Sequence, residues 1–159
     1  YKLVYTNIQK LIREESIDVE ERGNTRLCSF SGKFNESIFI VETQRKNNFL
    51  KNKDFLIMYN RLYTMNKQFI LLLFGSHVKG TAKRNSDIDV LVIANEETAQ
   101  EVERALDLLP HNIHLTAISY EEFRSMLRSK EFTVGSEAIK KNVILFGVED
   151  YYRLLHNAR

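Results

Sequence analysis

The sequence predicts an α/β domain that begins near residue 53, preceded by a small α+β unit. Two observations lead to this prediction. The first is a pair of continuous apolar runs, Phe69 to Phe74 and Ile88 to Ile93, which are typical of strands covered on both faces. The second is that segments with apolar residues at helical spacing alternate with these runs.

Apolar periodicity and end signals place the other elements of this domain. We expect two further strands, over residues 113–118 and 143–146. We expect helices over residues 53–65, 96–109, 119–128, 134–140 and 150–156. Pro110 interrupts the regular structure between the helix at 96–109 and the strand at 113–118. Ser119, followed three residues later by Glu122, is a capping box that opens the next helix.

The first third of the chain has a different pattern. Val4, Ile8 and Leu11 recur at helical spacing, which predicts an amphipathic helix over residues 2–15. Alternating residues on both sides of Arg22-Gly23-Asn24 predict a β-hairpin over residues 17–31. Residues 35–50 are compatible with a helix or a strand, and we take them as a connecting helix. We therefore divide the chain into three parts, 1–33, 34–52 and 53–159.

Composition limits the classes of protein to consider. Hydrophobic residues make up 43% of the chain, which is ordinary for a soluble globular protein. No apolar run approaches the roughly 18–20 residues that cross a bilayer, and the first residues lack the features of a signal peptide, so we expect a cytoplasmic protein without a membrane partner. A single cysteine, Cys28, rules out an internal disulfide and a cysteine-rich zinc site. The net charge of +2 gives only weak support for nucleic-acid binding.

The motif that points to chemistry lies between the two apolar runs. Gly75-Ser76 ends the first run, ten residues follow, and then comes Asp87-Ile88-Asp89. Without a side chain at Gly75, a phosphate group can approach the backbone. The Ser76 hydroxyl and free backbone N–H groups can hold phosphate oxygens. The predicted nucleotide-binding residues are Gly75, Ser76, Lys79, Lys83 and Arg84, the last three to neutralise a triphosphate.

The two aspartates suit a divalent metal. Asp87 and Asp89 are two residues apart on a predicted strand, so both side chains point to the same face. Carboxylates beside a phosphate site suit Mg²⁺, and a two-metal arrangement would activate an attacking hydroxyl and stabilise leaving pyrophosphate. Each half of the motif alone is weak evidence for a nucleotide- and metal-binding site. Their order, spacing and position after buried strands make the combination informative.

The Gly-Ser-x10-Asp-x-Asp segment resembles the signature of the polymerase-β-type nucleotidyltransferase superfamily, and looks most like its minimal prokaryotic members. The resemblance covers about residues 53–156. It implies a mixed sheet flanked by helices, an NTP with Mg²⁺ or Mn²⁺ as ligands, and transfer of a nucleotidyl group to an acceptor hydroxyl. It also implies that Ser76 contacts the phosphates and that Asp87 and Asp89 bind metal as catalytic residues.

The sequence departs from that family at one position. Active members carry a third carboxylate on the strand after the long helix, but residues 113–118 contain no Asp or Glu, and His114 stands at the expected place. A neutral imidazole is a poor Mg²⁺ ligand and a fair one for Mn²⁺. It can also act as a general base near neutral pH. A purely structural role for His114 is the alternative, so nucleotide binding is better supported than transfer.

Residues 1–31 resemble the recognition helix and wing of a winged helix-turn-helix. In that resemblance the helix faces a major groove and the hairpin tip reaches phosphates or the minor groove. The DNA-contacting residues would be Tyr5, Thr6, Asn7 and Lys10 on the helix, with Arg22, Asn24 and Arg26 at the tip. A winged helix before a nucleotidyltransferase resembles a group of prokaryotic, largely archaeal, regulators.

Three functions are compatible with these residues. The first is an enzyme that transfers a nucleotide from NTP. The second is a catalytically weak or inactive regulator that senses nucleotide and binds double-stranded DNA. The third is the antitoxin-like nucleotidyltransferase of a pair whose toxin is a helical protein. The expected partners are therefore NTP, with DNA, a second copy of the chain or a helical protein as alternatives.

Overall fold

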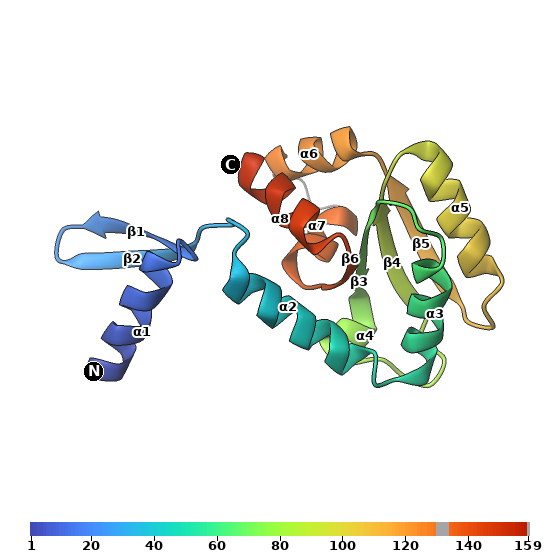
Figure 1. Cartoon of the computed structure of the whole chain (residues 1–159), viewed down its shortest axis with the longest axis horizontal. Helices are drawn as coiled ribbons and strands as arrows, with labels where there is room; N and C mark the ends of the chain where they lie inside the picture. The colour runs from blue at the N-terminus through green and yellow to red at the C-terminus, as the bar shows by residue number, and fades with distance from the viewer. Residues whose placement is uncertain (130–133, 159) are drawn as a thin grey trace.

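A four-stranded mixed sheet forms the centre of the molecule in the computed structural model, which describes residues 1–129 and 134–158 (Figure 1). The strand order is β5-β4-β3-β6. The bounds are Ile70–Phe74 for β3, Ile88–Ile93 for β4, Ile113–Ile118 for β5 and Val143–Phe146 for β6. β3 pairs antiparallel with β4 and with β6, whereas β4 pairs parallel with β5. The predicted mixed sheet flanked by helices is confirmed.

Helices cover both faces of the sheet, which explains why β3 is buried throughout and β4 at every residue except Asp89. One face packs against α3 (Lys53–Tyr63) and α5 (Glu96–Asp107). The other packs against α2 (Glu36–Phe49), α6 (Tyr120–Arg128), α7 (Val134–Lys140) and α8 (Val148–Asn157). Alternate side chains of the two central strands enter two different cores, so both strands are apolar almost without interruption.

The helix ends are fixed by side chains close in sequence. The predicted capping box is present at the start of α6: Glu122 N–H donates to Ser119 Oγ at 3.1 Å, and Ser119 N–H donates to Glu122 Oε2 at 2.7 Å. These hydrogen bonds from Ser119 lower the pKa of the Glu122 carboxyl below its ordinary value. Asparagine caps α2, α3 and α5 in a similar way, through the side chains of Asn35, Asn52 and Asn95.

The N-terminal unit extends away from the sheet (Figure 1). It consists of α1 (Lys2–Arg13) and a hairpin of β1 (Ile17–Arg22) and β2 (Thr25–Phe30). Gly23 supports the tight turn with φ +59°. No residue of α1 is buried. The predicted helix and hairpin are confirmed, whereas the winged-helix assignment and the three-part division of the chain stay predictions.

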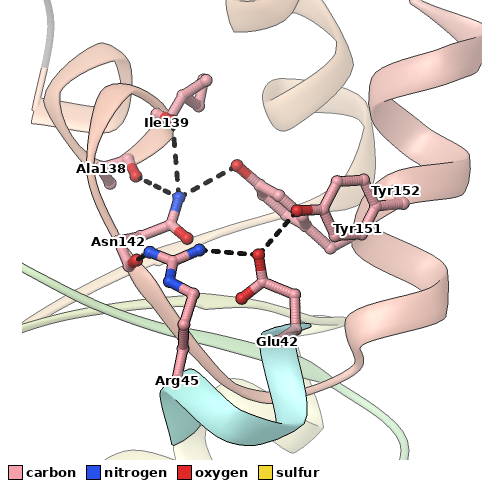
Figure 2. A network of polar contacts seen from close by, with 7 residues as sticks. All are labelled: Glu42, Arg45, Ala138, Ile139, Asn142, Tyr151 and Tyr152. Carbon is pink, nitrogen blue, oxygen red and sulfur yellow. Dashed lines mark hydrogen bonds and ion pairs between the residues drawn. The ribbon is translucent and has the colours of Figure 1, made fainter. Parts of the chain in front are cut away.

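The helix predicted over 35–50 is also confirmed, as α2. Buried polar contacts connect α2 to the rest of the protein (Figure 2). The Glu42 side chain is only 4% exposed. Its Oε1 accepts hydrogen bonds from Tyr152 Oη at 2.8 Å and Arg45 Nη1 at 2.7 Å. Arg45 Nη2 donates to the backbone carbonyl of Asn142. The Asn142 amide in turn donates to Tyr151 Oη at 3.1 Å, so one network joins α2 to α8.

Candidate functional site

The two halves of the sequence motif meet where β3 ends. Phe74, the last residue of β3, pairs with Asp89 of β4. Gly75 follows in a left-handed conformation, with φ +71°. A β-carbon built on Gly75 would lie 1.9 Å from Asp89 Oδ2. The Asp89 carboxylate therefore lies directly against the Gly75 backbone, and only glycine fits there.

Ser76 lies in the short helix α4 (Gly75–Lys79) that starts at this contact. Its backbone carbonyl accepts the N–H of Thr81 at 3.0 Å, and Gly80 ends the helix with φ +77°. The turn is thus closed by backbone hydrogen bonds, and the half-buried Ser76 side chain follows directly after the carboxylate contact.

Polar contacts to Ser86 hold the loop between the two halves of the motif. His77 Nε2 lies 3.1 Å from the backbone carbonyl of Ser86, and Lys83 N–H donates to Ser86 Oγ at 2.8 Å. The His77 ring also packs edge-on against Phe55, with centroids 5.4 Å apart. His77 therefore has a structural role, in that it ties the returning loop to α4. Ser86, which sequence analysis did not select, immediately precedes Asp87 and fixes where that residue enters the sheet.

The two aspartates lie at the start of β4. Asp87 is exposed and comes one residue before the strand, while the Asp89 side chain is 26% exposed. Between them, Ile88 points into the core beneath α3 and α5. Because side chains alternate along a strand, Asp89 faces away from Ile88, on the opposite side of the sheet.

His114 lies beside Asp89. The parallel register of β4 and β5 pairs these two residues, and His114 Nδ1 lies 3.5 Å from Asp89 Oδ1. The imidazole is 67% exposed, so it is accessible from solvent. Thr116, two residues further along β5, shares this face. The structure thus brings together Gly75, Asp89 and His114.

The predicted phosphate-neutralising cations have different surroundings. Lys79 Nζ forms an ion pair with Glu137 of α7, an acid that sequence analysis did not select. Lys83 and Arg84 are exposed on the loop. Arg84 lines a cavity of about 270 Å³, which it shares with Ile88 and His111. Ile88 faces α3 and α5, so this cavity lies on the other side of the strand from Asp89.

The acidic residues suit a metal ion whose coordination is completed by a substrate. No group of three or more His, Cys, Asp or Glu side chains suited to a metal ion occurs in residues 1–129 and 134–158. Mg²⁺ is commonly held by one or two carboxylates together with phosphate oxygens and water, without an all-protein cage. Asp87 and Asp89 match that donor set, and the oxygen ligands favour Mg²⁺ or Mn²⁺.

The residues predicted to contact DNA lie apart from this site, on α1 and the hairpin. All four helix residues are exposed, namely Tyr5, Thr6, Asn7 and Lys10. Thr6 Oγ1 donates to the backbone carbonyl of Lys2 at 2.9 Å. Arg22 and Arg26 form exposed ion pairs with Glu20 and Glu21, which reduces the positive charge at the hairpin tip.

Comparisons with known proteins identify one family whose model matches part of this chain. Residues 60–123 match the family described as "Nucleotidyltransferase domain", and they contain Gly75, both aspartates and His114. No curated protein matches the chain. One similar solved structure is described as "Crystal structure of the toxin-antitoxin with AMP-PNP". It is 23% identical to this chain with a TM-score of 0.38, and the match covers 62% of this chain and 81% of that one.

None of the helices in the described ranges has the length and apolar character needed to cross a membrane.

The family match and the mixed sheet around the motif together support the nucleotidyltransferase superfamily for this region of the chain.

Proposed function

We propose that this protein binds a nucleoside triphosphate with Mg²⁺ or Mn²⁺ at the edge formed by Gly75, Asp89 and His114, and transfers the nucleotidyl group to an acceptor hydroxyl. One observation carries the proposal: the Asp89 carboxylate lies against the Gly75 backbone, one residue from Ser76. The proposed metal ligand and the proposed phosphate-binding turn are thereby adjacent, as binding of a triphosphate together with a metal ion requires.

Each residue has a role that follows from its chemistry. The Ser76 hydroxyl and nearby backbone N–H groups donate to phosphate oxygens. Asp87 and Asp89 would hold the metal ion, which would supply positive charge to the phosphates and the reacting oxygens. Lys83, on the exposed loop, neutralises further phosphate charge, whereas Arg84 lines the cavity on the other side of the strand.

In the transfer step, the acceptor oxygen bonds to the α-phosphorus while the bond between that phosphorus and the bridging oxygen breaks. Pyrophosphate leaves with the bond electrons. The hydroxyl proton passes to a general base, and His114 is suited to this task because its imidazole is exposed beside Asp89.

Binding of ATP with Mn²⁺, measured by isothermal titration calorimetry, tests the proposal. We expect Asp89→Asn to weaken metal-dependent ATP binding by at least about tenfold, as expected when a metal ligand is lost. Asp107→Asn is the matched control, because Asp107 is an exposed acid on α5. Equal affinities in the two variants would remove the basis for the metal site. Pyrophosphate release in the presence of candidate acceptors then tests transfer.

A second candidate is a DNA-binding protein that responds to nucleotide. It is favoured by α1, which carries Lys2, Lys10 and Arg13, contains no acid and has no buried residue. A mobility-shift assay at low salt, with and without ATP, tests it. We expect Lys10→Ala/Arg13→Ala to weaken binding and the Lys140→Ala control, on α7, to preserve it. Failure of the wild-type protein to shift any duplex would exclude this function.

A further inference from the structure

The ion pair between Lys79 and Glu137 joins the phosphate turn to α7. Lys79 is the last residue of α4 and lies three positions after Ser76. Its ammonium group is held by Glu137 Oε1, and Lys79 and Glu137 have side chains that are 45% and 35% exposed. Resting on the function proposed above, we propose that Glu137 determines how strongly this site discriminates between nucleotides by the length of their phosphate chain, because it competes with phosphates for Lys79.

The residue that follows Glu137 in α7 belongs to the polar network shown in Figure 2. Ala138, the next residue, is fully buried. Its carbonyl accepts a hydrogen bond from Asn142 Nδ2 at 2.6 Å, and the same amide donates to Tyr151 Oη. Arg45 of α2 binds the Asn142 carbonyl. Contacts with α2 and α8 therefore hold the backbone of α7 at the residue next to Glu137, the partner of Lys79.

A phosphate chain can displace this carboxylate. A half-exposed ion pair contributes little to stability, so Lys79 exchanges partners at small cost. A triphosphate presents several negative oxygens, whereas Glu137 presents one charge. Once Lys79 has moved to the phosphates, the Glu137 carboxylate loses its partner and repels them. This repulsion grows with phosphate charge, so Glu137 lowers the affinity for a triphosphate more than for a monophosphate.

The same contact favours release of the product. When the leaving pyrophosphate departs, Glu137 pairs again with Lys79 and competes against rebinding. Glu137 is thus a positioning residue that acts through Lys79 and needs no contact with the reacting atoms.

Calorimetry with Mn²⁺ and three probes, ATP, AMP and inorganic tripolyphosphate, tests this inference in Glu137→Gln. Removing a surface charge interaction of up to about 1 kcal/mol corresponds to a change of roughly fivefold or less. We expect ATP and tripolyphosphate to bind about three- to fivefold more tightly and AMP to be unchanged. Glu149→Gln is the matched control, since Glu149 is an exposed acid paired with Arg153 at 2.6 Å on α8.

A second readout does not depend on nucleotide. Acylation of Lys79 by an amine-reactive reagent, followed by mass spectrometry, is expected to be faster in Glu137→Gln than in Glu149→Gln. Equal affinities and equal Lys79 reactivities in the two variants would overturn the role of Glu137 and leave the proposed function intact. Absence of metal-dependent ATP binding by the wild-type protein would defeat the proposed function, and this inference with it.

Discussion

Asp89 Oδ2 occupies the space that a side chain on Gly75 would fill, since a β-carbon there would lie 1.9 Å from this oxygen. Gly75 directly follows β3 and Asp89 belongs to β4, so the contact spans the antiparallel pairing of these strands. The Gly-Ser turn and the Asp-x-Asp segment therefore form one structural unit, although ten residues separate them in the sequence. Any change at position 75 acts on the carboxylate as well as on the turn.

We expect Gly75→Ala to abolish metal-dependent ATP binding and to destabilise the fold. The substitution forces an alanine into φ +71° and places its β-carbon against Asp89. A residue in this backbone region costs about 1–3 kcal/mol, and displacement of the carboxylate adds to that cost. Chemical denaturation and calorimetry with ATP and Mn²⁺ measure the two effects.

Gly80→Ala provides the control for backbone strain. Gly80 has φ +77°, but a β-carbon there meets no atom within 4 Å. We expect Gly80→Ala to lose only the stability that backbone strain accounts for in Gly75→Ala. We expect it to keep ATP binding. Similar binding by the two variants would show that the contact with Asp89 has no part in ligand affinity.

Much of this arrangement could be predicted from local patterns in the sequence. The strand assignments followed from continuous apolar runs, and the helix after Ser119 followed from its capping box. The partner of Lys79 could not be predicted, because Glu137 lies 58 residues away on a separate helix. Nor could the burial of Glu42, since a lone acid in a polar segment usually faces water. Long-range polar pairing depends on packing, which periodicity does not encode.

Replacing His114 tests what a third carboxylate would contribute. In His114→Asp, an additional acid would lie beside Asp89, where the imidazole Nδ1 is now 3.5 Å from Oδ1. Because metal affinity increases with the number of charged oxygen ligands, we expect Mg²⁺ to bind about tenfold more tightly in the presence of ATP. Titration of Mg²⁺ at a fixed ATP concentration measures the change.

His156→Asp is the control for this substitution. His156 is exposed on α8, so the variant introduces the same charge away from the strand ends. An Mg²⁺ affinity that rises equally in both variants would indicate a general charge effect. An unchanged affinity in His114→Asp would mean that position 114 does not face the metal.

The attachment of α2 predicts a large effect at Glu42. Glu42→Ala leaves Arg45 and the Tyr152 hydroxyl without their shared acceptor, so we expect the free energy of unfolding to fall by about 3 kcal/mol. Glu36→Ala is the control in the exposed first turn of α2, where loss of an acid costs at most about 1 kcal/mol. Urea denaturation compares them, and equal losses would mean that the network contributes little.

Two buried tyrosines predict loss of stability at alkaline pH. Burial, the principal cause, raises the pKa of Tyr151 to about 12, and burial together with the hydrogen bond to Glu42 raises the pKa of Tyr152. In the unfolded chain both phenols have a pKa of about 10. The folded protein therefore binds more protons above pH 10, so the stability from Tyr151 is complete below pH 10 and declines between pH 10 and about pH 12.

Tyr151→Phe is expected to flatten that decline. The slope of the unfolding free energy against pH should decrease by up to about 1.4 kcal/mol per pH unit, which corresponds to one proton. At neutral pH the variant should lose only about 1 kcal/mol, because it gives up one hydrogen bond from Asn142. Urea denaturation between pH 8 and pH 12, with Tyr5→Phe on the exposed α1 as control, measures both quantities. A wild-type slope that persists in Tyr151→Phe would assign the alkaline transition to other groups and contradict the role of this buried phenol.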